Sequence, residues 1–185
     1  MGRNRNSAAF ATKVIVYGAV FAALAAVLGQ LLPIRPIPEM KFTLDKFLLF
    51  LSGVFFGPVV GGMIGFVAEF AGGNLFGVGF TPWLCFPAVF YGVCGGLFRG
   101  FLSRKLTIPR LALSYLIPTV IGAVLVQSVA LAWTYGPFAE KVWFNLFFRT
   151  IQFSVMMVVE VPLIYFLLKS RLFKQVGLWP IAKKQ

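Results

Sequence analysis

Long apolar segments, separated by short polar stretches, recur along the whole chain. Their approximate bounds are 14–32, 43–56, 59–71, 83–102, 111–133 and 146–168. A helix needs about 20 mainly apolar residues to cross the hydrocarbon core of a bilayer. The pattern therefore predicts an all-α integral membrane protein, with six transmembrane helices in a single membrane domain over residues 1–185. The second and third segments are short, so these helices tilt little, lie where the bilayer is thin or surround a cavity.

Composition favours lipid as the surroundings of most of the chain. Of the 185 residues, 59% are hydrophobic and 12% are charged, whereas soluble domains have about 45–50% and about 25%. A globular core of this size cannot bury the apolar excess, because its surface still needs polar groups. We therefore expect short loops between the membrane helices and no separate soluble domain.

The 17 basic residues are distributed unevenly over the ends of the apolar segments. Twelve of them, and no acidic residue, fall in the N-terminal stretch, in segment 99–110 and in the C-terminal tail. Basic residues accumulate on the cytoplasmic side of membrane proteins, so six helices place both termini in the cytoplasm. The net charge of +12 is then a signal of topology and of contact with anionic headgroups. It forms no contiguous face suited to nucleic acid.

The sequence contains no recognisable catalytic or metal-binding constellation. It has no histidine, which excludes His-based general-base and His-ligated zinc mechanisms. Cys85 and Cys94 lie nine residues apart in one apolar segment, a spacing typical of neither a disulfide framework nor a metal site. The nucleotide-binding motif GxxxxGK[ST] is also missing. We expect a protein that is not an enzyme, binds no cofactor and hydrolyses no ATP itself.

Polar and aromatic residues gather at the ends of the segments opposite the basic termini. The aromatic residues there could form an ordinary belt at the membrane surface, whereas an arginine and a glutamine that enter an apolar segment, as Arg149 and Gln152 do, usually face protein or a water-filled cavity. We expect an outward-facing ligand pocket at these ends. Ionisable groups within apolar segments need a partner or have a function; we favour ligand contact for Glu69 and structural pairing for Glu160, and both roles stay open for each. The proline-containing stretch 33–46 predicts a loop outside the hydrocarbon, and whether 33–45 covers the pocket stays open. The candidate substrate-binding residues are Lys41, Glu69, Asn74, Trp83, Trp133, Arg149 and Gln152.

The first apolar segment is rich in alanine. Small residues four apart let two helices approach closely in a membrane. They indicate either ordinary packing within the chain or a contact with a partner's helix. The candidate partner contacts are Ala19, Ala22, Ala23 and Ala26.

An ordered series of motifs over about residues 14–172 resembles one family of membrane proteins. It comprises Ala19 and Ala23, then SGVFFGPVVGGMIGFVAEFAGG, GFTPW and VALAWTYGPF, and finally the segment from Arg149 to VEVPLIYFLL. In this order the motifs resemble the S components of energy-coupling factor (ECF) vitamin transporters, most of all the folate group. The resemblance implies a bacterial plasma-membrane protein that binds a vitamin from outside with high affinity.

The resemblance also implies partners and roles for residues. Through its alanine face the chain would contact a membrane coupling subunit that carries two ABC-type ATPases, which use the ATP. With folate as ligand, Glu69 would accept hydrogen bonds from the pterin and Arg149 would bind the carboxylates of the glutamate tail. The other candidates would assist as follows: Asn74 at the pterin, Trp83 and Trp133 by stacking, and Lys41 and Gln152 at the tail.

Other functions stay open. An S component of this size could instead bind pantothenate, a queuosine precursor or thiamin. In a different class, the chain could be a small integral-membrane enzyme or a structural membrane subunit, although the missing catalytic residues argue against the enzyme.

Overall fold

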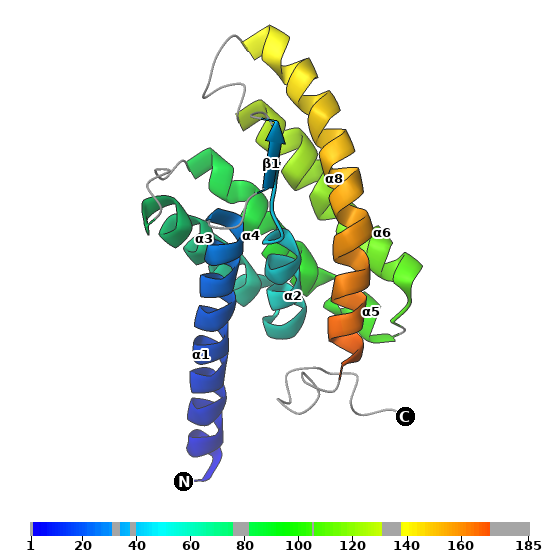
Figure 1. The fold of residues 1–185 in the computed structure, drawn as a ribbon. Helices are drawn as coiled ribbons and strands as arrows, with labels where there is room; N and C mark the ends of the chain where they lie inside the picture. Colours follow the sequence, from blue (N-terminus) through cyan, green and yellow to red (C-terminus); the bar gives the residue numbers. More distant parts are fainter. Residues whose placement is uncertain are drawn as a thin grey trace.

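The computed structural model describes residues 2–30, 34–37, 40–75, 82–104, 106–130 and 138–170. These residues form a helical bundle with one short β-hairpin (Figure 1). In chain order the elements are α1 (Gly2–Gln30), β1 (Ile34–Ile37), β2 (Met40–Phe42), α2 (Lys46–Phe56), α3 (Pro58–Leu75), α4 (Pro82–Leu97), α5 (Arg99–Arg104), α6 (Ile108–Pro118), η1 (Thr119–Val126) and α8 (Phe138–Lys169).

Helix α2 lies at the centre of the bundle. Residues Lys46 to Phe55 are all buried, although the helix has only 11 residues. A helix that is apolar all round must be enclosed by other elements; α1, α3 and α4 pack against it, and α8 also contacts it. In Figure 1 the long helices α1 and α8 run along two sides of this centre.

Glycines bring α2, α3 and α4 into backbone contact. A Cβ atom added at Gly53, Gly61 or Gly92 would collide with the backbone of the neighbouring helix. The turn between α2 and α3 is a single residue, Gly57, whose φ of 95° is in the left-handed region that favours glycine. The glycines of the third apolar segment therefore serve helix packing, as small residues do in membrane proteins.

Four helical stretches of the described chain are long and apolar enough to cross a membrane. They are Thr12–Gln30, Cys85–Arg104, Ile108–Ala130 and Leu146–Lys169. Helix α2 is apolar but shorter than these. The structure thus confirms a helical protein with four candidate membrane spans among the described residues, whereas six transmembrane helices and two cytoplasmic termini stay predictions.

The stretch between the first two apolar segments differs from the predicted loop. Ile34–Ile37 and Met40–Phe42 pair as an antiparallel hairpin, with Ile34 opposite Phe42. Extended pairing satisfies the backbone polar groups of a stretch whose prolines prevent a regular helix. The hairpin leads through residues 43–45 directly into the buried first turn of α2.

Candidate ligand-binding site

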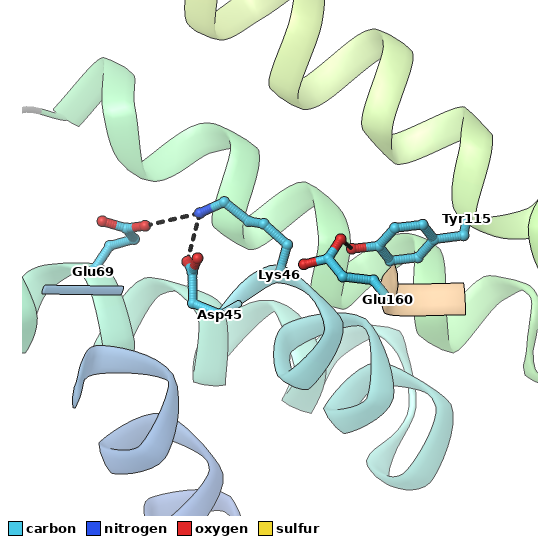
Figure 2. A network of polar contacts seen from close by, with 5 residues as sticks. All are labelled: Asp45, Lys46, Glu69, Tyr115 and Glu160. Carbon is cyan, nitrogen blue, oxygen red and sulfur yellow. Dashed lines mark hydrogen bonds and ion pairs between the residues drawn. The ribbon is translucent and has the colours of Figure 1, made fainter. Parts of the chain in front are cut away.

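Three charged side chains meet at the first turn of α2. The Nζ atom of Lys46 lies 2.7 Å from Oδ2 of Asp45 and 3.2 Å from Oε1 of Glu69 (Figure 2). Asp45 directly precedes α2, and its backbone carbonyl accepts hydrogen bonds from the N–H groups of Leu48 and Leu49. Its carboxylate makes no capping bond to the helix and pairs with Lys46 instead. One ammonium group is therefore shared by two carboxylates from different helices.

The three members of this cluster differ in their access to solvent. The side chains of Lys46 and Asp45 are 9% and 6% exposed, whereas that of Glu69 is 22% exposed. Figure 2 shows the second carboxylate oxygen of Glu69 pointing away from Lys46. Breaking a buried ion pair leaves an uncompensated charge, which is strongly destabilising. Asp45 and Lys46 therefore form the fixed part of the cluster, and Glu69 is its accessible end.

A small cavity adjoins both carboxylates of the cluster. It has a volume of about 10 Å³ and is lined by α1, α2 and α3, including Gly29, Gln30, Asp45 and Glu69. Gly29 allows α1 to approach the Asp45 side chain, because a Cβ there would lie 3.3 Å from the carboxylate carbon. The cavity is large enough for about one water molecule. A group that enters it meets the side chains of Asp45 and Glu69.

A second polar cluster lies on the other side of Lys46. The hydroxyl of Tyr115 donates to Oε2 of Glu160 at 2.6 Å, and the hydroxyl of Tyr91 donates to Oγ1 of Thr119 at 3.0 Å. Thr119 in turn donates to the backbone carbonyl of Tyr115 at 2.7 Å. Glu160 is only 2% exposed. These contacts join α4, α6, η1 and α8, so the structure gives Glu160 the structural pairing that the sequence favoured.

An apolar pocket of about 580 Å³ lies between the start of α4 and the end of the fifth apolar segment. Its lining residues are Trp83, Phe86, Leu125, Val126, Val129 and Ala130. Its volume is within the usual range of small-molecule sites, about 300–1,000 Å³. Trp83, a predicted stacking residue, is largely exposed and lines this pocket. Trp83 and Phe86 belong to α4, which packs against α3, the helix that carries Glu69.

Arg149 and Gln152 lie on α8 beside the pocket-forming segment. The Nη1 atom of Arg149 donates to the carbonyl of Ala123 over 3.5 Å, and its guanidinium lies 6.0 Å from the ring centre of Phe153. Ala123 belongs to η1, a π-helical stretch of eight residues. Such stretches are rare and frequent at functional sites. Gln152 is buried. Both residues therefore face protein, as polar residues in an apolar helix should.

Of the remaining three predicted site residues, the structure describes the side chain of Asn74 only. Asn74, in the last turn of α3, is exposed, and its amide donates to the carbonyl of Phe70 at 2.8 Å. Lys41 belongs to β2, but its side chain is outside the described residues. Trp133 is also outside them. In the structure, Glu69 belongs to the ionic cluster, Trp83 lines the pocket and Arg149 contacts η1. Gln152 is buried on α8. The roles of Lys41, Asn74 and Trp133 stay predictions.

Sequence reasoning missed Asp45 and Lys46 as members of the site. Both were assigned to the end of a loop and the start of an apolar segment. The available signal was the Asp-Lys pair directly before ten apolar or small residues. Adjacent charges that enter a membrane helix usually pair with each other and often belong to a functional site inside the protein.

The alanine face of α1 is divided between the inside and the outside of the molecule. Ala22 and Ala26 are buried, and an added Cβ at Gly72 of α3 would touch Ala26. Ala19 and Ala23 are exposed. The prediction that all four contact a partner needs correction, because Ala22 and Ala26 already pack within the chain. Ala19 and Ala23 alone are available to a partner helix.

The ionic cluster, the apolar pocket and the membrane-length helices are features expected of a helical membrane protein that binds a small molecule. Comparison with protein families is more specific. The family model of the ECF-type riboflavin transporter, S component, matches residues 9–169. The chain therefore belongs to this family, whose members are the membrane-embedded substrate-binding components of vitamin transporters.

A solved structure supports the same assignment. The chain matches the crystal structure of FolT bound with folic acid with a TM-score of 0.72 and 25% sequence identity, over 84% of this chain and 92% of that one. A search of curated proteins gives no significant match. The resemblance to ECF S components seen in the sequence is thus confirmed by both family and fold.

Proposed function

We propose that this S component binds folate and delivers it through an ATP-driven coupling module. The observation that carries the proposal is the likeness of the fold to FolT bound with folic acid, over 84% of the chain. Membership of the S-component family supports the transport role. Folate itself is proposed from the neighbour's ligand together with the chemistry of the site.

The ionic cluster and the pocket supply the two kinds of contact that folate needs. The pterin presents adjacent N–H donors along one edge, and a carboxylate accepts such a pair in a charge-assisted bond. Glu69 is the suitable acceptor, because its side chain is the most exposed member of the cluster and has one oxygen turned away from Lys46. The flat rings then extend toward the pocket, where Trp83 can stack on them.

Riboflavin is the second candidate, because the matching family model is named for a riboflavin transporter. The ring edge of riboflavin places one N–H between two carbonyl oxygens, and those oxygens would repel an ionised Glu69. Its ribityl chain carries no charge, whereas the glutamate tail of folate carries two carboxylates. Two features favour folate over riboflavin. One is the cationic Arg149 on α8, and the other is the carboxylate of Glu69, which has one oxygen turned away from Lys46.

The proposed partners are a membrane coupling subunit and two ABC ATPases, which would use the ATP. Docking of the coupling subunit would use the exposed face of α1 at Ala19 and Ala23. The protein would lie in the bacterial plasma membrane with both termini in the cytoplasm. The twelve basic residues of the termini and of segment 99–110 support this orientation.

Binding measurements on the purified chain test the proposal. Titration with folic acid and with riboflavin in detergent, followed by tryptophan fluorescence and calorimetry, should give saturable binding of folic acid and much weaker binding of riboflavin. Replacing Arg149 by alanine should weaken the binding of folic acid more than the binding of pteroic acid, which lacks the glutamate tail. Binding of riboflavin but not folic acid would overturn the folate assignment.

Mass spectrometry of compounds that co-purify with the chain tests the remaining alternatives. Pantothenate, a queuosine precursor or thiamin in place of folate would keep the S-component function and change the vitamin. Co-purification with the coupling subunit and its ATPases supports the transport role. Turnover of a lipid substrate by the isolated chain would indicate a membrane enzyme instead.

A further inference from the structure

Four cations gather at the end of the bundle opposite the hairpin. They belong to short α5, to the first turn of α6 and to the last turn of α8, which lie at the same end of the molecule in Figure 1. These cations are Arg99, Arg104, Arg110 and Lys169. Helices α6 and α8 pack against each other, and the contact of Arg110 with Phe101 joins α6 to α5.

Among the described residues, no carboxylate forms an ion pair with these cations. The two ion pairs found among the described residues are both made by Lys46, at the centre of the bundle. The third acidic side chain that the structure describes, Glu160, is buried against Tyr115. The sequence itself has no Asp or Glu from residue 70 to residue 139. Within the described part of the chain, the charge of these cations is thus available to an external anion.

Aromatic rings hold two of the cations in place. The guanidinium of Arg110 lies 5.3 Å from the ring centre of Phe101, and the ammonium of Lys169 lies 5.7 Å from that of Tyr165. Such contacts restrict a long side chain without neutralising its charge. Side chains that are already restricted lose less conformational freedom when they bind an anion, and this favours binding.

Large apolar side chains are exposed next to the cations. They are Leu97, Phe101, Ile108 and Phe166. A free phosphate ion would gain nothing from these side chains, whereas the acyl chains of a phospholipid would cover them. Positive charge and exposed apolar surface therefore occur together on these elements, as a phospholipid with its phosphate and acyl chains requires.

We propose that this cationic end, formed by α5, α6 and α8, binds the headgroup of an anionic phospholipid. The guanidinium groups of Arg104 and Arg110 donate hydrogen bonds to the phosphate oxygens, since planar guanidinium groups suit such anions. Basic clusters at the ends of membrane helices bind cardiolipin and related headgroups in this way. The site is separate from the vitamin site and does not depend on which vitamin is bound.

Native mass spectrometry of the full chain in detergent tests this proposal. The protein is incubated with phosphatidylglycerol, cardiolipin or phosphatidylcholine, and the fraction with lipid bound is measured. Wild type should retain the two anionic lipids and little phosphatidylcholine. In Arg104→Gln/Arg110→Gln, retention of anionic lipid should fall about tenfold, because each basic residue near the surface contributes appreciably to the attraction.

Two control variants keep the outcome specific. Lys13→Gln removes an exposed cation from α1 and should leave lipid retention unchanged. Arg110→Lys keeps the charge and should restore part of the binding that Arg110→Gln loses. Equal retention in wild type and the double glutamine variant would overturn the proposal. So would equal retention of phosphatidylcholine, or displacement of the lipid by millimolar inorganic phosphate, which would indicate a site for free anions.

Discussion

The polar cluster around Lys46 and the polar cluster around Glu160 both contain a carboxylate from an apolar helix, but they differ in one respect. The cluster of Asp45, Lys46 and Glu69 ends on a side chain that is 22% exposed. The cluster of Glu160 and Tyr115 is closed on all sides, with Glu160 2% exposed. A buried carboxylate in an apolar helix is thus no evidence for a ligand site on its own. Access to one of its oxygens separates a site from a structural contact.

Lys46→Met tests the buried ion pair of Lys46 with Asp45 and should have the largest effect. It leaves Asp45 buried without its counter-ion, which costs about 3–5 kcal/mol. The free energy of unfolding in mixed micelles should fall by that amount. Lys46→Arg should keep most of the stability, and Asp45→Asn/Lys46→Met should be less destabilised than the single change, since it removes both charges. An unchanged free energy of unfolding in Lys46→Met would contradict the pairing.

Glu69→Gln tests the accessible end of the same cluster. Hydrogen bonds to charged groups contribute about 1.5–3 kcal/mol, so the Kd for folic acid should rise at least about tenfold. Stability should change less than in Lys46→Met, because Asp45 still neutralises Lys46. Calorimetric titration measures the affinity. A large loss of stability with unchanged affinity would make Glu69 a structural residue like Glu160.

Tyr115→Phe tests the closed cluster. It removes the hydroxyl that donates to Glu160 at 2.6 Å and should cost about 1–3 kcal/mol of stability. The affinity for folic acid should stay within the error of the wild-type value. Comparing this variant with Glu69→Gln separates the two clusters, because one change should act on stability and the other on binding. A weaker affinity in Tyr115→Phe would connect the closed cluster to the ligand.

Trp83→Ala tests the apolar pocket that Trp83 lines and should have the smallest effect. Aromatic stacking contributes about 0.5–1.5 kcal/mol, so the Kd for folic acid should rise by a few fold. Because Trp83 is largely exposed, stability should hardly change. Trp143→Ala is a matched control, since Trp143 is also exposed and does not line the pocket. Equal effects of the two changes would remove Trp83 from the site.

The sequence predicted much of the helical architecture, because apolar segments of membrane length give a strong signal. It also found Glu69 and Glu160, whose charges stand out in apolar surroundings. It missed the role of Lys46, because a charge at the start of a segment resembles an ordinary loop charge. Whether such a residue enters the bundle depends on the hairpin that precedes it, and the prolines of that stretch indicated only that it is not helical.

Two other features depend on geometry that residue types do not specify. Ala19 and Ala22 are neighbours on a helix surface, and the way α1 packs against α2 and α3 leaves Ala22 buried and Ala19 exposed. The π-helical stretch η1 is likewise a change of hydrogen-bond register in an apolar segment that would also suit an ordinary α-helix.

The glycine contacts between α2, α3 and α4 limit which parts of the protein can respond to a ligand. At Gly53, Gly61 and Gly92 the helices have no side chain between them that could change rotamer, so we expect α2, α3 and α4 to move as one block. A conformational change on vitamin binding is then expected mainly in the elements around it, namely α1, the hairpin, η1 and α8.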